Sequence, residues 1–244
     1  MKKFLISLLI LFFAVSGFLF GDTIKLATLN WEPFLGENLE SKGFVSEIVR
    51  EAFAAIGDEV EIEFYPWSRC MALGEAGQVH GVIGAWYNEE RAEKFFYSEA
   101  LLTNKKLFFT LNSSSVPAEY TTLEDLENYT IGIISGFTYS DNFDSADYLT
   151  KDKSPDLKTA FEKLFRGRID IVVSTYYTSI NTLENEFASQ KDKISELSPA
   201  LKEDPLYVIF SKNAANGENI RNRFNEGLSK IKEDGTFDSI MSRY

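Results

Sequence analysis

One short pattern occurs twice in the chain and constrains the fold more than any other feature. Gly77-x-Val79-His80-x-Val82-Ile83 and Gly167-x-Ile169-Asp170-x-Val172-Val173 share the same spacing, and each follows a predicted helix. A glycine after a helix favours its termination, and the β-branched run behind it favours a buried strand. The repeat therefore predicts two similar α/β units whose strands alternate with helices and pair mainly in parallel.

The first unit is predicted from the periodicity of its apolar residues. Ile24–Leu29, Glu61–Tyr65 and Val79–Gly84 are expected to be strands, and a short helix is expected between Pro66 and Leu73. A longer helix has one buried stripe and ends at Gly57. The stripe is Val45, Ile48, Val49, Ala52, Phe53 and Ile56.

The second unit repeats this order. Tyr129–Ile134 and Ile169–Val173 are predicted strands, and Ser154-Pro155 is the predicted N-cap and first-turn proline of the helix that ends at Gly167. The chain then forms a strand at Leu206–Phe210 and ends in helices. The predicted fold is α/β, with two mixed, mainly parallel sheets and flanking helices.

Polar segments indicate where the chain passes between the two units. Asn112–Pro117 is suited to one crossing and Leu197–Pro205 to a second. We therefore expect a first lobe of residues 22–109 and 206–244, a second lobe of residues 113–197, and crossings near residues 110–112 and 198–205. Two crossings form a hinge, because each lobe can rotate while few dihedral angles change.

The N-terminus has the pattern of a secretory signal. Lys2 and Lys3 precede an apolar run from Phe4 to Phe20, which predicts a signal peptide of residues 1–21; cleavage after Gly17 and an uncleaved anchor are the alternatives. No cysteine follows the run, so a lipid anchor is not expected. The mature protein is predicted to be free in its compartment.

Composition excludes several functions. Loss of Lys2 and Lys3 with the signal changes the net charge from −12 to −14, so nucleic acid and anionic membranes are unfavourable partners. Cys70 and His80 are the single cysteine and histidine, which leaves no intramolecular disulfide and no Cys/His metal cluster. His80 is expected to be structural, which leaves no other histidine for a catalytic triad. No glycine-rich phosphate motif occurs. We therefore expect no cofactor, no metal and no enzymatic activity.

Aromatic residues gather where the predicted strands end. Ligands in open α/β sheets bind beyond the carboxyl ends of the strands, and all three tryptophans follow such ends. Together they predict a cleft for a flat or apolar group, although each alone is equally well read as a core or rim residue. The aromatic residues are Trp31, Trp67, Trp86, Tyr87, Phe137 and Tyr139.

Two arginines are candidates for binding an anion. Arg91 lies in the first turn of a helix that Asn88 is expected to cap, where a cation is unfavourable unless it points outward or holds an anion. Its guanidinium matches a carboxylate with two hydrogen bonds. Arg69 follows Trp67 closely and could hold a second anionic group or pair with an acid. Either arginine could equally be an ordinary surface residue.

A series of short motifs extends from the first predicted strand to the C-terminus. The motifs are Trp31-Glu32-Pro33-Phe34, Gly43-Phe44, Gly77-x-Val79-His80, Asn88-x-x-Arg91, Tyr97-Ser98, Asp125-Leu126, Ser135-Gly136-Phe137-Thr138, Gly167-Arg168-Ile169-Asp170 and Asp234-Gly235-Thr236-Phe237. In order and spacing they resemble extracellular solute-binding protein family 3, the type II periplasmic binding proteins of polar amino-acid ABC importers. The resemblance covers nearly the whole chain after the signal.

The resemblance implies a two-lobed periplasmic-binding-protein-like type II fold and a role in uptake. A periplasmic, monomeric protein would capture a small carboxylate-bearing solute between its lobes and deliver it to the membrane permease of an ABC importer. By position, Trp31 and Trp67 would enclose the ligand side chain and Arg91 would hold its carboxylate. Backbone amides near Ala85-Trp86 and at Phe137-Thr138 would complete that contact.

The sequence departs from the family pattern at two positions. Thr175 and Thr28 stand where acids often receive an α-ammonium group, so recognition of an α-amino acid is open; Glu32 or Glu47 could compensate, or the ligand could lack an amine. The ligand itself is not identified by the sequence. A sensing partner of a membrane receptor and a dehydratase-like periplasmic enzyme are the alternatives.

Overall fold

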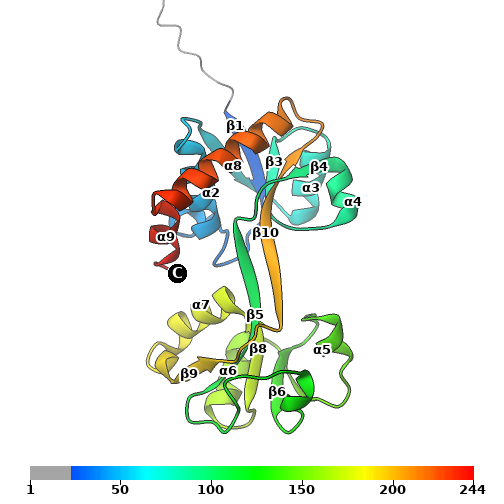
Figure 1. Ribbon diagram of the computed structural model, residues 1–244, viewed down its shortest axis with the longest axis vertical. Coiled ribbons are helices and arrows are strands. Elements are labelled where there is room, and N and C mark those ends of the chain that lie inside the picture. The colour runs from blue at the N-terminus through cyan, green and yellow to red at the C-terminus, as the bar shows by residue number, and fades with distance from the viewer. Residues whose placement is uncertain (1–22) are drawn as a thin grey trace, which may run out of the picture.

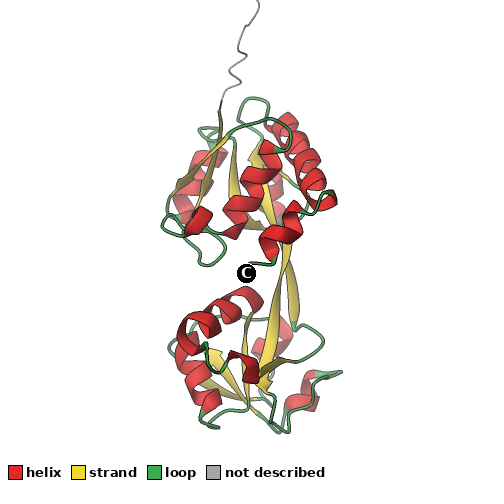
Figure 2. Cartoon of the chain, turned by 90° about the vertical axis from the view of Figure 1, so that its left-hand side faces the viewer, coloured by secondary structure: helices red, strands yellow, loops and turns green. Residues whose placement is uncertain are grey.

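The computed structural model describes residues 23–244 as two groups of elements joined by two long strands (Figure 1). The predicted signal peptide, residues 1–21, lies outside the described residues. The joining strands are β5 (Leu102–Leu111) and β10 (Lys202–Ser211). Helices cover the strands in both groups (Figure 2).

The first group, called half 1, combines the first predicted unit with the C-terminal helices. Its elements are β1 (Ile24–Thr28), η1 (Glu40–Lys42), α2 (Phe44–Ala54), β2 (Val60–Phe64), α3 (Trp67–Glu75), β3 (Gly81–Trp86), α4 (Glu89–Lys94), β4 (Phe95–Tyr97), α8 (Gly217–Glu233) and α9 (Thr236–Met241).

The second group, called half 2, contains the second predicted unit. Its elements are η2 (Leu123–Leu126), β6 (Thr130–Ile134), α5 (Asp141–Ser145), β7 (Thr150–Ser154), α6 (Leu157–Phe165), β8 (Ile171–Thr175), α7 (Tyr176–Phe187), η3 (Lys191–Lys193) and β9 (Ile194–Glu196).

Strand pairing confirms the predicted α/β class. In half 1, β1 pairs in parallel with β2 and β3, and in half 2, β6 pairs in parallel with β7 and β8. Both joining strands run antiparallel to their neighbours. The described strands follow the order β2-β1-β3-β10-β5-β8-β6-β7, so the two expected sheets are continuous through β10 and β5.

The strand register shows where the chain passes between the halves. β5 pairs with β10 over Leu102–Lys106 and with β8 from Lys106 to Phe109. The passage along β5 therefore lies a few residues before the predicted crossing at 110–112. Asn112–Pro117 instead belongs to half 2, where Val116 packs in a core with Phe108. The polar run Thr103–Lys106 marks the passage, because the apolar residues after it already enter the core of half 2.

Two local details also differ from the sequence prediction. Ser154 is the last residue of β7, and the N-cap of α6 is Asp156, whose Oδ1 accepts a hydrogen bond from the Thr159 amide at 2.7 Å. A carboxylate at the N-cap also complements the positive end of the helix dipole. The strand β7 was not predicted, because its sequence, TKDKS, lacks an apolar alternation.

Close contact between α2 and α8 closes the core of half 1. Buried Phe53 and Phe224 meet with ring centroids 5.2 Å apart. Gly227 of α8 is buried, and a methyl group at its Cα would collide with the carbonyl oxygen of Ala52. The two helix backbones therefore approach closely because residue 227 has no side chain.

Gly227→Ala tests this contact. Helix propensity alone would favour alanine by about 1 kcal/mol. Overpacking against a backbone carbonyl costs about 1–3 kcal/mol, so we expect a net loss in the free energy of unfolding measured by urea denaturation. Asn222→Ala, at an exposed position of the same helix, is the control and should be neutral or slightly stabilising. A stabilised Gly227→Ala protein would contradict the close approach of the helices.

Candidate functional site

The two parallel sets of strands point their carboxyl ends at each other. Trp86, the last residue of β3, pairs with Leu206, which pairs in turn with Leu102 of β5. Thr175, the last residue of β8, pairs with Lys106 of the same strand. Leu102 and Lys106 are four positions apart on β5, which places the ends of β3 and β8 about 13 Å from each other along this strand. The segments after these strands, including the start of α7, therefore face one another across the passage between the halves.

Arg91 lies at the half 1 side of this passage. Its amide donates to Asn88 Oδ1 at 2.9 Å, as expected for the N-cap of α4, and its Nη1 donates to the Trp86 carbonyl at 2.8 Å. Its guanidinium carbon lies 5.6 Å from the ring centroid of Trp67. Among the described residues no carboxylate pairs with Arg91, and one of its five N–H donors is used by Trp86.

The segment from Trp86 to Asn88, which orients Arg91, is held by hydrogen bonds with Tyr97. The Tyr97 hydroxyl donates to the Trp86 carbonyl at 3.3 Å and accepts from the Asn88 amide at 3.2 Å. Ala85 is buried in β3 and pairs with Tyr207, so the exposed part of this segment begins at Trp86. The guanidinium is thus held beside the strand end by a carbonyl, a capped helix turn and an indole ring.

The Trp67 ring lies beside this arginine, and Trp31 is linked to it through Trp86. Trp31 stacks on Phe34 with centroids 4.4 Å apart and meets Trp86 edge-on at 5.5 Å. Trp86 is 45% exposed. Contacts therefore connect Trp31, Trp86, Arg91 and Trp67 in one group. Arg69 is exposed and lies over the Tyr65 ring, 4.7 Å from its centroid, and no contact links it to this group.

On the half 2 side, the passage is bordered by the loop after β6. Phe137 is 67% exposed and Thr138 is exposed. The Phe137 amide already donates to the Ile134 carbonyl at 3.2 Å, whereas the Thr138 amide has no acceptor in the described chain. Thr138 therefore supplies one donor that this loop can offer an anion.

Lys106, which the sequence analysis did not single out, supports that loop from β5. Its Nζ donates to the Tyr139 carbonyl at 3.0 Å and lies 3.3 Å from Asp204 Oδ2. The Tyr139 hydroxyl accepts from the Ile134 amide at 2.8 Å, and burial raises the pKa of Tyr139. Only the register of β5 brings this lysine to the loop, so sequence spacing alone could not reveal it.

The two threonines in place of acids have different surroundings. Thr28 is fully buried and its hydroxyl donates to the Ile83 carbonyl at 3.1 Å, which makes it a core residue. Thr175 is partly exposed at the start of α7, with its hydroxyl donating to Thr178 Oγ1 at 2.9 Å. Glu47 of α2, considered as a substitute acid, forms an ion pair with Arg243 at 2.7 Å. Thr175 is therefore the threonine placed to face the passage.

His80 lies at the other end of β3. Its Nδ1 accepts a hydrogen bond from the Lys25 amide at 2.9 Å and so braces β1 against β3. Within residues 23–244, no group of three or more His, Cys, Asp or Glu side chains could hold a metal ion. No helix of that same part has the length and hydrophobicity to cross a bilayer.

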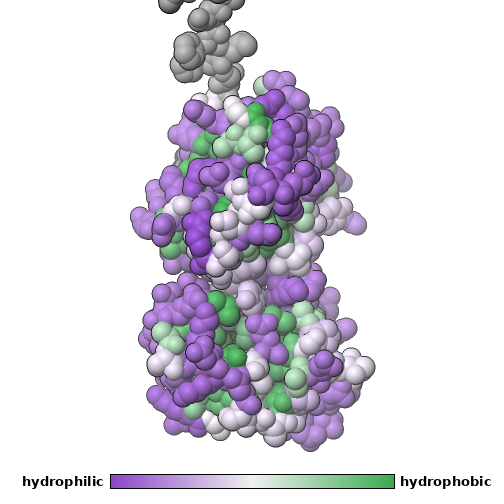
Figure 3. Space-filling view, turned by 60° about the vertical axis from the view of Figure 1, so that its left-hand side comes forward, coloured by the Kyte–Doolittle hydropathy of each residue, from purple (hydrophilic) through white to green (hydrophobic). Residues whose placement is uncertain are grey.

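Tyr177 is a contact between the halves that the sequence analysis missed. It belongs to α7 of half 2, yet its ring centroid lies 5.4 Å from that of Phe34 and 5.1 Å from that of Phe44, both in half 1. Burial raises the pKa of its hydroxyl. Figure 3 shows the surface narrowing where the halves meet, with apolar residues visible among polar ones.

Comparison with known proteins places this geometry in a family. A model of bacterial extracellular solute-binding proteins, family 3, matches residues 24–244. A "Probable histidine-binding protein" of Campylobacter jejuni is 22% identical over 227 residues, which cover 91% of this chain and 84% of the relative.

Solved structures share the fold. The second substrate-binding domain of a putative amino-acid ABC transporter from Streptococcus pneumoniae has a TM-score of 0.74 at 24% identity, covering 91% of this chain and 99% of that one. The substrate-binding domain 2 of GlnP from Lactococcus lactis, in open conformation, has a TM-score of 0.72 at 18% identity, covering 91% and 95%. Because the family model spans essentially all described residues, the chain belongs to the bacterial extracellular solute-binding proteins of family 3.

Proposed function

We propose that this protein is exported to the periplasm, closes its two lobes around a small carboxylate-bearing solute, and delivers that solute to the permease of an ABC importer. The ligand class is a polar amino acid or a related organic acid. Family membership supports solute binding. The observation that carries the proposal is Arg91, held at the facing strand ends without a carboxylate partner among the described residues.

A carboxylate is the group that best fits the donors at this place. The Arg91 guanidinium retains four N–H donors in a planar array, which suits two parallel hydrogen bonds to one carboxylate. Trp67 and Trp86 lie beside it and reduce its exposure to water, so a bound anion is screened less than one at an open surface. The Thr138 amide can contribute from half 2 once the halves approach.

The remainder of the ligand is expected to be flat or apolar. Trp31 and Trp67 are the aromatic walls on the half 1 side, and the relative from Campylobacter jejuni is named for histidine, whose imidazole is such a group. Thr175 offers a hydroxyl in place of a carboxylate for any ammonium group. The first ligands to test are therefore histidine and related amino acids, with amine-free carboxylates beside them.

Closure would explain the exposed aromatic residues at the strand ends. Trp86 and Phe137 are 45% and 67% exposed, although they lie on the two sides of the passage. Rotation about the passage at residues 102–106 and 202–206 would bring the lobes together and remove these rings from water, which favours the closed form when a ligand fills the gap.

Arg91→Ala tests the anion contact. Loss of one partner of a buried charge pair costs about 2–5 kcal/mol, so we expect affinity to fall about 30-fold or more, measured by isothermal titration calorimetry with the ligand identified below. Arg166→Ala, which removes an exposed arginine paired with Glu162 on α6, is the control and should bind normally. Equal affinities in the two variants would remove Arg91 from the site.

Trp86 reports closure directly. We expect a saturating ligand to lower acrylamide quenching of tryptophan fluorescence, because the 45% exposed ring of Trp86 becomes covered. Trp86→Phe should retain folding and lose part of that change, the remainder coming from Trp31 and Trp67. Quenching that stays the same at saturation, in a protein shown to bind, would contradict closure over this residue.

The ligand can be found by a thermal-shift screen of amino acids and organic acids, with native mass spectrometry of the freshly purified protein. A ligand at 100 times its Kd stabilises the folded state by about 2.7 kcal/mol, which raises Tm by roughly 5–10 °C for a chain of this size. Carboxylate-bearing compounds should give the shifts, and their amides should not. Shifts from uncharged analogues equal to those from the acids would contradict carboxylate recognition.

A further inference from the structure

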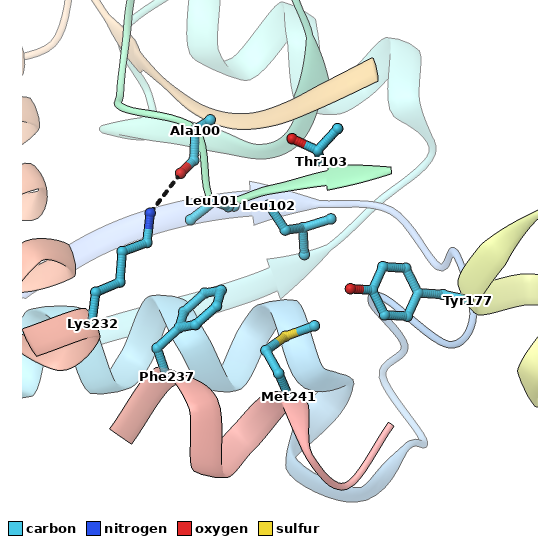
Figure 4. Close-up of a pocket in the computed structure, with 8 residues that line it drawn as sticks. All are labelled: Ala100, Leu101, Leu102, Thr103, Tyr177, Lys232, Phe237 and Met241. Atoms are coloured by element: carbon cyan, nitrogen blue, oxygen red, sulfur yellow. Dashed lines mark hydrogen bonds between the residues drawn. The ribbon is translucent and has the colours of Figure 1, made fainter. Parts of the chain in front are cut away.

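A pocket beside β5 is lined by residues other than those of the candidate site. It has a volume of about 520 Å³, within the range of small-molecule sites. Its walls come from the start of β5, from α8 and α9, and from Tyr177 of α7 (Figure 4). None of the residues that line it belongs to the group around Arg91. Both halves contribute, because Tyr177 is the wall supplied by half 2.

The pocket is apolar along one side and carries a cation at one end. Leu102, Phe237 and Met241 supply hydrocarbon and aromatic surface (Figure 4). The Lys232 Nζ donates to the Ala100 carbonyl at 3.0 Å and lies 5.4 Å from the ring centroid of Phe237. No other hydrogen-bond acceptor for Lys232 occurs in the described chain, so two of its three N–H donors remain for a ligand.

The surroundings of Lys232 favour an anion. Lys232 is an exposed residue, but partial burial of its side chain lowers the pKa of its ammonium group, and Glu99 opposes that shift. The ammonium group lies beside the apolar surface of Phe237, and an anion bound there can accept the hydrogens that Ala100 leaves unused. At the other end, the Tyr177 hydroxyl points toward the pocket and can donate to or accept from a polar group (Figure 4).

We propose that this pocket binds a small apolar monocarboxylate, with its carboxylate on Lys232 and its hydrocarbon part against Leu102, Phe237 and Met241. A dicarboxylate or a zwitterion would leave a second charge against that apolar surface, where nothing compensates for its loss of hydration. The pocket therefore differs in specificity from the candidate site, whose walls are tryptophans and whose cation is a guanidinium. This inference does not depend on the proposed function.

Calorimetric titration with octanoate tests the proposal. We expect saturable binding of one octanoate per chain to the wild-type protein. Lys232→Met keeps most of the length of the side chain and removes its charge, and it should weaken binding about tenfold or more. Lys230→Met is the matched control, because Lys230 lies on the same helix, is exposed and pairs with Glu226; it should bind as the wild type does.

Two further variants separate this pocket from the candidate site. Met241→Trp fills the pocket and should abolish octanoate binding, with folding checked by circular dichroism. Arg91→Ala should leave octanoate affinity unchanged. Loss of octanoate binding in Arg91→Ala, the same loss in Lys230→Met as in Lys232→Met, or the absence of saturable binding to the wild type would each overturn the proposal.

Discussion

The pairing of β5 with β10 over Leu102–Lys106 is the constraint on which the rest of the structure depends. It is the only stretch at which the two joining strands bond to each other within the described chain, and β3 and β8 end at its two limits. The segments that follow those strands are therefore brought face to face by the pairing of the strands. The geometry of the candidate site follows from backbone register before any ligand is considered.

The candidate site contains an arginine that is oriented by the surrounding protein. On half 1, Trp86, Asn88 and Tyr97 hold Arg91 by main-chain and side-chain hydrogen bonds, so the cation is oriented before a ligand arrives. Such preorganisation reduces the entropic cost of binding. Ring contacts continue from Trp86 through Trp31 and Phe34 to Tyr177, the aromatic residue of half 2 that packs on half 1. The candidate site and the contact between halves are thus physically connected.

Much of the fold and part of the site could be predicted from the sequence. Periodicity and glycine positions predicted most of the strands and helices, because these depend on nearby residues, whereas β5, β7 and α7 were not predicted. The tryptophans at strand ends could be predicted for the same reason. The position of the passage, the support from Lys106 and the contact of Tyr177 could not, because each depends on pairing between segments far apart in the chain. The resemblance of the motif around Arg91 supplied a role that periodicity alone left open between a surface residue and an anion site.

The central claim is that two hinged lobes hold a carboxylate on Arg91, and a crystal structure of the protein saturated with its tightest-binding carboxylate tests it most directly. The account predicts the carboxylate oxygens within hydrogen-bonding distance of both terminal nitrogens of Arg91, with residues 137 and 138 brought up from the opposite lobe. A ligand bound elsewhere, or an Arg91 guanidinium that still contacts the Trp86 carbonyl and no ligand, would contradict it.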